Sequence, residues 1–492
     1  MFYKARILYE LFALCIYFNL NNYAYIIYDI MCLYSGDFME SEKIQTFLKN
    51  IYKELNVSPD NEEYIRYLGE KVIKAYKYAK KSNISFDEFM VRIKSLIPKF
   101  IEEYNRMSVN FSNVKNIMNT NFGVSINFEL IDLFDIAKLC TDNDTFIKLR
   151  DEYFESLGKD TRIRNYDYIF PGLKDISYEE VIKIQHHVLN DVDCITPEWS
   201  GKMRCVIDTS KPLLVNNEIN MEIFNFVYLD KIAKFARDNN IKLRLHNIIW
   251  HRDFMSVFEN ASPEQIYKFL DIYMNEISKR YGDILYSVDV LNEIASDSPD
   301  KVLRESKWLE KLGEDYYINV LRIAKKNFPN VNLFYNEYGE EREEKRKNII
   351  EIINRIKEIE HREGIVLLDG IGIQSHYSSM TTDEQIKEAY RDYSMLGKIL
   401  QVTELDVSNK GEEGKFNYQT NRVFRTVLDC VTTYGVSLVN IWGISSTISW
   451  KSGKVDNYLD KNCNVSAYSK KIVELYSKKR KISLDNEKQY NC

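Results

Sequence analysis

The pattern of apolar and polar residues changes near residue 157. Between Met39 and that point apolar residues recur every three or four positions, which predicts amphipathic helices. One such stripe comprises Ile44, Phe47, Leu48, Ile51 and Leu55. Ser85 and Glu88 stand at capping-box spacing and predict the start of a further helix. The pattern therefore predicts a small all-α domain over 39–157, whose role the sequence leaves open.

Beyond about residue 160, short β-rich runs alternate with amphipathic helical stretches. The runs are 166–170, 192–198, 242–251, 286–293, 332–338, 368–376, 400–407 and 436–444. Eight strands alternating with helices predict an α/β fold of the (β/α)8 TIM-barrel type. An open doubly wound sheet is the alternative, but it expects a glycine-rich turn after its first strand, and the sequence has none there. We place the barrel at 158–480 and a polar tail at 481–492.

The N-terminal 38 residues form an apolar leader that allows two interpretations. Residues 11–28 carry no charge and follow Lys4 and Arg6, as in a signal peptide or anchor. However, Glu10 interrupts the apolar run, asparagines lie inside it, and no small-residue cleavage site follows. A bilayer span takes about 20 predominantly apolar residues. The other interpretation is that translation starts at Met39, so the compartment and membrane association stay open.

Composition removes several classes of protein. The chain has 492 residues, of which 45% are hydrophobic and 28% charged, as in ordinary globular proteins. The net charge of −6 argues against a nucleic-acid binder. None of the eight cysteines forms a C-x-x-C pair, which argues against a zinc or disulfide framework and favours free thiols. The sequence predicts no metal and no cofactor, and we expect a monomer.

Polar residues cluster where the later predicted strands end. Active sites of (β/α)8 barrels lie at the carboxyl-terminal ends of the strands. The residues at these ends are Glu198, Lys202, His246, Trp250, His251, Asn292, Glu293, Asn336, Glu337, Gln374, His376, Glu404, Asp406 and Trp442. Because carboxylates are almost never buried unpaired, we expect these side chains to line a polar site.

Two carboxylates in this set suggest a reaction. Glu293 and Glu404 follow different strands, and paired carboxylates flanking a scissile bond are the machinery of glycoside hydrolysis. The indole faces of Trp250, Trp442 and Trp450 suit the apolar faces of sugar rings. The pattern favours a polysaccharide-cleaving barrel over another barrel enzyme.

The segments that carry these residues resemble those of family 10 glycoside hydrolases, the retaining endo-β-1,4-xylanases. The segments are HNIIWH (246–251), VDVLNE (288–293), GIQSH (372–376), TELD (403–406) and WGISSTISW (442–450). They stand in the family's order and lie within residues 160–480. The resemblance implies a substrate that is xylan or a related β-linked polysaccharide or oligosaccharide. It also implies action outside the cell, for which the N-terminus provides no clean export signal.

The resemblance also implies roles for individual residues. Glu293 becomes the general acid/base, which must hold a proton near neutral pH, and Glu404 becomes the nucleophile. His376 becomes the hydrogen-bond partner of the nucleophile with Asp406 behind it, and Asn292 the residue that binds the sugar 2-hydroxyl. Substrate binding falls to Glu198, Lys202, His246, Trp250, Gln374, Trp442 and Trp450. Retention of configuration predicts a separation of about 5–5.5 Å between the two carboxyls.

The sequence departs from the family at four positions. Trp199 stands where the family has asparagine and Asp253 where it has glutamine, and both belong to the next glycone subsite outward. Glu337 is one methylene longer than the family aspartate, and Ser446 replaces another aspartate. The hypothesis is retained glycosidase chemistry with an altered glycone preference, such as for a decorated xylan or another β-linked polymer.

Two other functions stay open at this point. One is a non-catalytic carbohydrate-binding or regulatory pseudoenzyme on the same barrel, which would be expected to lose a catalytic carboxylate. The other is an interaction protein that acts through 39–157. Glu293 and Glu404 are both present, which favours the enzyme.

Overall fold

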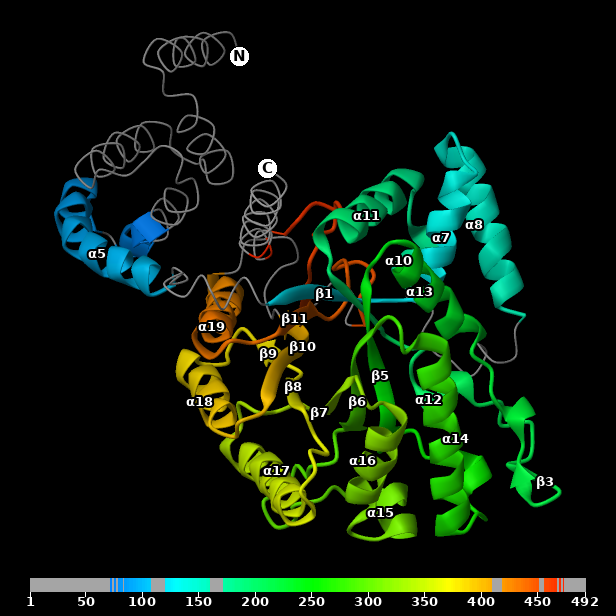
Figure 1. The fold of residues 1–492 in the computed structure, drawn as a ribbon. Helices are drawn as coiled ribbons and strands as arrows, with labels where there is room; N and C mark the ends of the chain where they lie inside the picture. The colour runs from blue at the N-terminus through cyan, green and yellow to red at the C-terminus, as the bar shows by residue number, and fades with distance from the viewer. Residues whose placement is uncertain are drawn as a thin grey trace, which may run out of the picture. The chain divides into compact units, whose positions relative to one another are not determined.

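The computed structural model describes residues 71–72, 75–76, 78–82, 84–107, 120–159, 171–408, 418–450, 455–466, 469 and 472. The chain divides into two compact units, Met1–Val109 and Asn110–Cys492 (Figure 1). The predicted leader at 1–38, the predicted run at 166–170 and the predicted tail at 481–492 lie outside the described residues.

The described part of the N-terminal unit is helical. Its main helix, α5, spans Phe86–Met107. Ser85 Oγ accepts a hydrogen bond from the backbone N–H of Glu88 at 3.3 Å, so the predicted helix start is confirmed. Phe89, Ile93 and Ile97 of this helix are buried, and the rings of Tyr76 and Phe89 lie 5.1 Å apart. The predicted stripe at 44–55 lies outside the described residues.

The second unit is a closed barrel. The strands of the barrel among the described residues are β1 (Asn121–Ile126), β2 (Cys194–Pro197), β5 (Lys242–Trp250), β6 (Leu285–Asn292), β7 (Asn332–Glu337), β8 (Gly370–Ile373), β10 (Ile399–Ser408) and β11 (Leu438–Ile441). These eight strands pair in parallel in this order, and β11 pairs with both β10 and β1, which closes the ring. The barrel fold predicted from the alternating pattern is confirmed.

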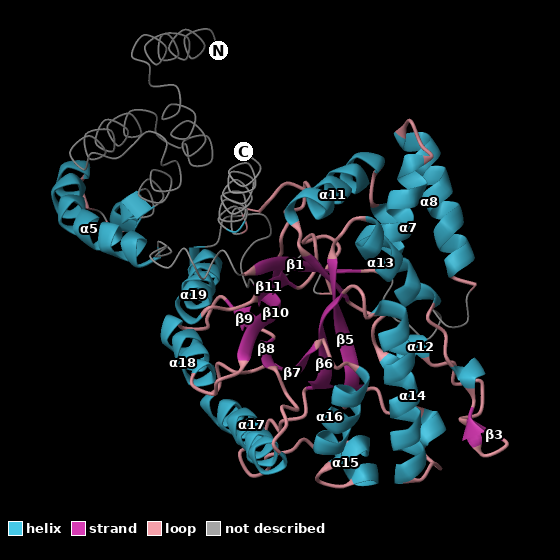
Figure 2. Cartoon of the chain, in the orientation of Figure 1, coloured by secondary structure: helices cyan, strands magenta, loops and turns pink. Residues whose placement is uncertain are grey.

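Helices cover the outside of the ring of strands, as Figure 2 shows. They are α7 (Phe128–Lys138), α8 (Asn143–Leu157), α10 (Pro171–Asp175), α11 (Tyr178–Asp191), α12 (Met203–Val206), α13 (Val227–Asp238), α14 (Pro263–Tyr281), α15 (Lys307–Leu312), α16 (Tyr316–Asn327), α17 (Glu343–Glu363), α18 (Asp383–Ser394) and α19 (Tyr418–Tyr434). Capping fixes several starts. In α14, for example, Ser262 and Gln265 form a capping box with Pro263 at the first helical position.

Short elements complete the unit. They are β3 (Leu214–Val215), β4 (Glu218–Ile219), β9 (His376–Ser378), β12 (Val455–Asp456) and the 3₁₀ helices η2 (Met221–Ile223) and η3 (Ser256–Phe258). The strand β9 pairs in parallel with β10, so that His376 stands opposite Asp406. This pairing brings the ends of two strands together at the carboxyl-terminal side of the barrel.

The first strand of the barrel is a correction to the sequence prediction. The place beside β2 and β11 is taken by β1 at 121–126 rather than by the predicted run at 166–170. The predicted domain boundary at 157/158 is therefore wrong, because β1, α7 and α8 belong to the barrel unit. Phe122, Val124 and Ile126 are buried, and they alternate with Gly123 and Ser125. A short strand with such small residues lies between helical patterns and is easily absorbed into them.

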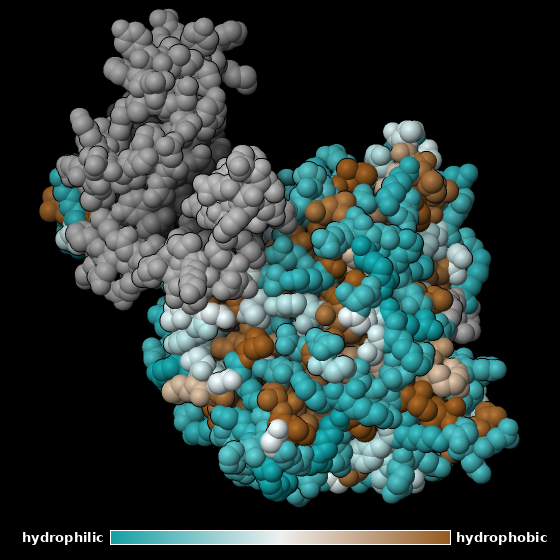
Figure 3. All heavy atoms as spheres, viewed as in Figure 1, coloured by the Kyte–Doolittle hydropathy of each residue, from teal (hydrophilic) through white to brown (hydrophobic). Residues whose placement is uncertain are grey.

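One face of the barrel unit is mostly hydrophilic. Figure 3 shows hydrophilic side chains over the helices of the barrel unit, with apolar patches scattered among them. Within the described residues, no helix combines the length and the apolar character that crossing a membrane requires. The described cysteines are free thiols, as expected: Cys140, Cys194, Cys205, Cys430 and Cys463.

Candidate active site

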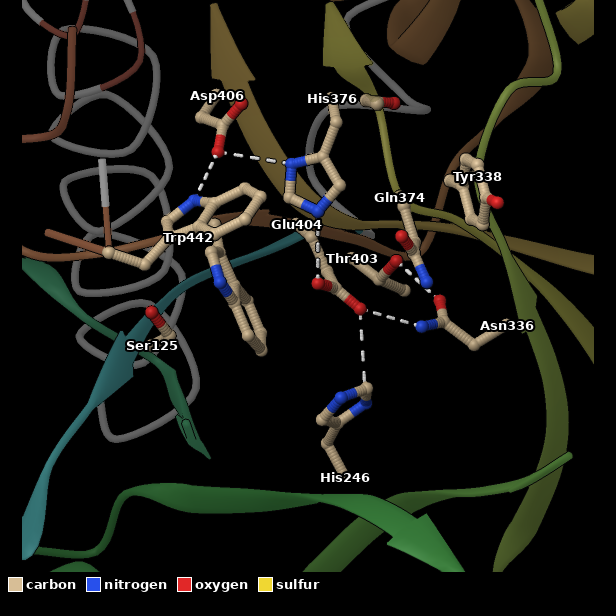
Figure 4. Close-up of polar contacts among 12 residues, drawn as sticks. Ser125, His246, Asn336, Tyr338, Gln374, His376, Thr403, Glu404, Asp406 and Trp442 are labelled. Carbon is tan, nitrogen blue, oxygen red and sulfur yellow. Dashed lines mark hydrogen bonds and ion pairs between the residues drawn. The ribbon is translucent and has the colours of Figure 1, made fainter. Parts of the chain in front are cut away.

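Glu404 lies within β10, and its carboxylate is almost fully buried. Asn336 Nδ2 donates to Oε1 at 2.7 Å, and His376 Nε2 lies 3.2 Å from Oε2 (Figure 4). His246 Nδ1 lies 3.8 Å from Oε1. Burial opposes the charge of this carboxylate, but His246 and His376 outweigh burial and lower the pKa of Glu404 to about 2. Glu404 is therefore ionised at neutral pH.

His376 connects Glu404 to a second carboxylate. Its Nδ1 lies 3.0 Å from Asp406 Oδ2, on the ring edge opposite Glu404. Trp450 Nε1 donates to the same Asp406 oxygen at 2.8 Å. Burial would lower the pKa of His376, but Asp406 and Glu404 together raise it to about 10. The imidazole is thus a cation held between two carboxylates.

Glu293 directly follows β6 and has a different environment. The backbone of Glu293 is in the left-handed conformation, with a φ of 56°. Trp250 Nε1 donates to Oε2 at 2.8 Å and Gln374 Nε2 donates to Oε1 at 3.2 Å. The backbone carbonyl of Glu293 accepts from Arg304 Nε at 3.0 Å, which anchors the turn. The carboxyl therefore receives an indole N–H and an amide N–H, both from uncharged side chains.

The imidazole beside Glu293 is uncharged. His251 Nδ1 lies 3.5 Å from Glu293 Oε2. Burial is the main cause that lowers the pKa of His251 to about 4, and it outweighs the attraction to Glu293. His251 was noted in the sequence as a polar residue at a strand end, and the structure places it beside the Glu293 carboxyl.

Three side-chain amides link the two glutamates. Asn336 Nδ2 donates both to Glu404 and to Asn292 Oδ1, the latter at 2.9 Å. Gln374 Nε2 lies 3.3 Å from the same Asn292 oxygen and also donates to Glu293. The structure therefore brings the two carboxyls, from β6 and β10, into one hydrogen-bonded network.

Asn336 was noted in the sequence only as a polar strand end. Its orientation is set by Thr403 Oγ1, which donates to Asn336 Oδ1 at 2.6 Å and so directs the amide N–H groups toward Glu404 (Figure 4). Its place at the end of β7 was the only signal available from the sequence.

His246 is oriented by residues of β5 and β6. Its Nδ1 lies 2.8 Å from Asp289 Oδ2, and Asn247 Nδ2 lies 3.1 Å from its Nε2. Arg244 donates to the same Asp289 oxygen. Asp289 and Arg244 were not among the predicted site residues, because both lie inside strands where a sequence pattern cannot separate core from site.

The end of β2 supplies Glu198 and Lys202. Ser125 Oγ donates to Glu198 Oε2 at 3.3 Å, so the strand missed in the sequence also contributes to the site. Burial raises the pKa of Glu198 to about 7, although Lys202 opposes this shift. The loop packs closely on β5, because a Cβ on Gly201 would lie 2.4 Å from the carbonyl oxygen of His246.

The predicted tryptophans are arranged around the two histidines. The Trp442 ring is buried and lies edge-on at 5.3 Å from the His246 ring. The Trp450 ring lies 5.3 Å from that of His376 and is 41% exposed. Of these two, Trp450 is the one that offers an open indole face.

At two of the positions that depart from the family pattern, the carboxylate forms an ion pair or hydrogen bonds inside the protein. Asp253 is fully buried and pairs with Arg204. Glu337 accepts from the backbone N–H of Ala295 at 2.9 Å and lies 3.2 Å from Lys345 Nζ. Nothing in the structure explains the serine at position 446.

No group of three or more potential metal ligands occurs in the described parts of the chain. The site consists of carboxyls, imidazoles, amides and indoles.

Comparisons with known proteins match the barrel. The family model of glycosyl hydrolase family 10 covers residues 169–474. The endo-1,4-beta-xylanase A of Caldicellulosiruptor saccharolyticus is 31% identical over 259 residues, which cover 46% of this chain and 71% of that protein. The endo-1,4-beta-xylanase B of Paenibacillus barcinonensis is 29% identical over 254 residues, which cover 48% and 74%.

Solved structures show the same fold. A psychrophilic glycoside hydrolase family 10 endo-beta-1,4-xylanase is similar with a TM-score of 0.54 and 23% identity, over 72% of this chain and 96% of that one. The xylanase 10B of Thermotoga petrophila RKU-1, solved with xylobiose, has a TM-score of 0.54 and 19% identity, over 76% and 98%.

Proposed function

This chain belongs to glycosyl hydrolase family 10, and on that premise we propose that it is a retaining endo-β-1,4-glycosidase of the xylanase type. The observation that supports this most strongly is that two carboxyls in one hydrogen-bonded network have different neighbouring groups. Glu404 lies beside two histidines and is ionised, whereas Glu293 receives only uncharged donors. Two carboxyls with different environments are what double displacement requires.

In the first step Glu404 acts as nucleophile and Glu293 as acid. A Glu404 oxygen attacks the anomeric carbon, the bond from that carbon to the glycosidic oxygen breaks, and Glu293 donates its proton to the leaving oxygen. The Asn336 amide holds the attacking carboxylate in place. The products are a glycosyl ester on Glu404 and a shortened chain with a free hydroxyl.

In the second step the roles reverse. Glu293, now ionised, takes a proton from water while the water oxygen attacks the anomeric carbon and the ester bond breaks. Glu404 leaves as a carboxylate, and the low pKa of about 2 makes it a good leaving group. His376 and Asn336 stabilise the charge that returns to it. Two inversions at one carbon give net retention.

The remaining predicted residues support this chemistry. Asn292 lies between the two glutamates, where its amide can meet the sugar 2-hydroxyl, and Asp406 keeps His376 protonated. The residues that would surround the sugar are Glu198, Lys202, His246, Trp250, Gln374, Trp442 and Trp450. The carboxyl separation of about 5–5.5 Å expected for retention stays a prediction.

Azide rescue tests both the reaction and the roles. The Glu404→Ala and Glu293→Ala variants are assayed with an activated aryl β-xylobioside in the presence of azide. With Glu404→Ala, azide occupies the place of the nucleophile, and we expect the α-glycosyl azide. With Glu293→Ala, azide attacks the glycosyl ester and the β-glycosyl azide is expected.

The wild-type protein provides the control for this experiment. We expect it to cleave linear xylo-oligosaccharides and to release the β-anomer first, as followed by NMR. A wild-type protein that cleaves no β-1,4-linked xylo-oligosaccharide would contradict the proposal and would favour the non-catalytic alternative.

A further inference from the structure

Positive charge gathers around the indole of Trp250, the residue that also holds Glu293. Lys202 Nζ lies 4.7 Å from the centroid of this ring, and the guanidinium carbons of Arg204 and Arg252 each lie 5.6 Å from it. Cations are attracted to an indole face, but this attraction neutralises no charge. The space over the Trp250 ring, where a neutral sugar ring would stack, therefore holds three cationic side chains.

Lys202 is the most confined of these cations. Lys202 is only 6% exposed. Its ammonium also lies 4.3 Å from the centroid of the Trp199 ring, so two indoles clamp it. Among the described residues this ammonium has no hydrogen-bond acceptor and no ion-pair partner. A buried charge without such a partner is unfavourable, so Lys202 is prepared to bind an acceptor from outside the protein.

The carboxyls nearby leave an excess of positive charge. Asp253 pairs with Arg204, and burial, partly opposed by Arg204, raises the pKa of Asp253. Glu198, the other carboxyl that faces Lys202, has its pKa raised to about 7 by burial. The exposed guanidinium of Arg252 forms no ion pair with any residue that the structure describes.

We propose that this rim, formed by Trp199, Lys202, Arg204, Arg252 and Asp253, binds a sugar unit that carries a carboxylate. Arg252 supplies a forked pair of donors that fits a carboxylate, and Lys202 adds a second charge. A neutral sugar hydroxyl could accept from Lys202 but would leave the excess charge uncompensated. The inference rests on the proposed function, since the acidic unit belongs to the β-linked chain that is cleaved.

The experiment compares three substrates. They are a linear xylo-oligosaccharide, the same chain with a glucuronic acid branch on its non-reducing side, and the methyl ester of that branched chain. The ester keeps the shape of the branch and removes its charge. We expect the wild-type kcat/KM to be about tenfold higher for the acid than for the ester. The preference should shrink in 1 M NaCl, where charges are screened.

Arg252→Gln is the test variant. It should abolish the preference for the acid and leave kcat/KM for the linear chain unchanged. Arg355→Gln is the matched control, because it removes the same charge from α17, where Arg355 pairs with Asp315. The control should keep the wild-type preference.

The outcomes separate this inference from the proposed function. Equal kcat/KM for acid and ester, with the linear chain cleaved, would overturn the inference and leave the function standing. A preference for the acid that survives in Arg252→Gln would overturn the assignment of the carboxylate to this rim. Cleavage of none of the three substrates would overturn the proposed function and the inference with it.

Discussion

Glu404 and Glu293 are both glutamates on parallel barrel strands, Glu404 within β10 and Glu293 directly after β6, yet their surroundings differ. Glu404 is contacted by His376, by an amide and at longer range by His246, and its pKa is about 2. Glu293 is contacted by an indole, by an amide and by the neutral His251. The comparison teaches that the charge of the neighbouring imidazole, rather than the type of residue, divides the work between two identical side chains.

The largest expected effect comes from Glu404→Gln. The amide cannot attack the anomeric carbon, so kcat should fall by about 10⁴-fold or more. The loss should be equal for a linear xylo-oligosaccharide and for an aryl glycoside with a good leaving group, because both need the nucleophile. Steady-state kinetics on both substrates measure it. Substantial turnover of either substrate would argue against Glu404 as nucleophile.

Glu293→Ala should separate the two substrates. General acid catalysis contributes about 10²–10⁴-fold, so kcat for the oligosaccharide should fall by that factor. With a good leaving group the first step needs no acid, and the glycosyl ester should accumulate as a burst of released phenol. Stopped-flow measurement of the phenol tests this. An equal loss for both substrates without a burst would assign Glu293 a different role.

His376→Ala should make the surroundings of Glu404 more like those of Glu293. The imidazolium 3.2 Å from the carboxylate favours its charged form, so its removal should raise the pKa of Glu404 from about 2. The acid limb of kcat/KM should then move to higher pH. Two charge-assisted contacts are lost, so kcat should fall by about a hundredfold at neutral pH.

The control for this variant is His361→Ala in α17, which removes an exposed histidine. A pH–rate profile of both variants is the measurement. The control should follow the wild type, and an acid limb that stays in place in His376→Ala would contradict the electrostatic explanation.

Trp250→Phe should have the smallest effect. It keeps an aromatic ring and removes the N–H that donates to Glu293 at 2.8 Å. The loss of one hydrogen bond to a carboxyl should lower kcat by about tenfold. Turnover of the xylo-oligosaccharide measures the loss. The comparison variant is Trp308→Phe, which loses the hydrogen bond from its indole to the backbone carbonyl of Trp250 but not the bond to Glu293. A larger loss in Trp308→Phe would show that packing, rather than the contact with Glu293, matters here.

Much of the barrel could be predicted because its signals are local. The predicted runs ending near Asn292, Glu337 and Asp406 coincide with β6, β7 and β10, since alternation and strand-end polar residues can be found within a few positions. The strand β1 was missed because its six residues include Gly123 and Ser125, which weaken a β pattern. The domain boundary was wrong for the same reason.

The network between the carboxyls could not be predicted to the same degree. Asn336 donates hydrogen bonds to Asn292 and Glu404, which lie 44 and 68 positions away in the sequence. Thr403, which orients the Asn336 amide, comes from another strand. The clamp around Lys202 depends on Trp199, which follows β2, and Trp250, the last residue of β5, meeting at its ammonium. Such meetings follow from barrel closure, and short motifs do not encode them.

The sequence by itself determined the architecture and the positions of the two carboxyls, because strand periodicity and strand-end chemistry are properties of neighbouring residues. Only the tertiary structure showed how two histidines keep the buried Glu404 ionised, which imidazole is charged and which cation has no partner among the described residues. Those states depend on burial and on charges contributed by distant strands, because electrostatic interactions act across space rather than along the chain.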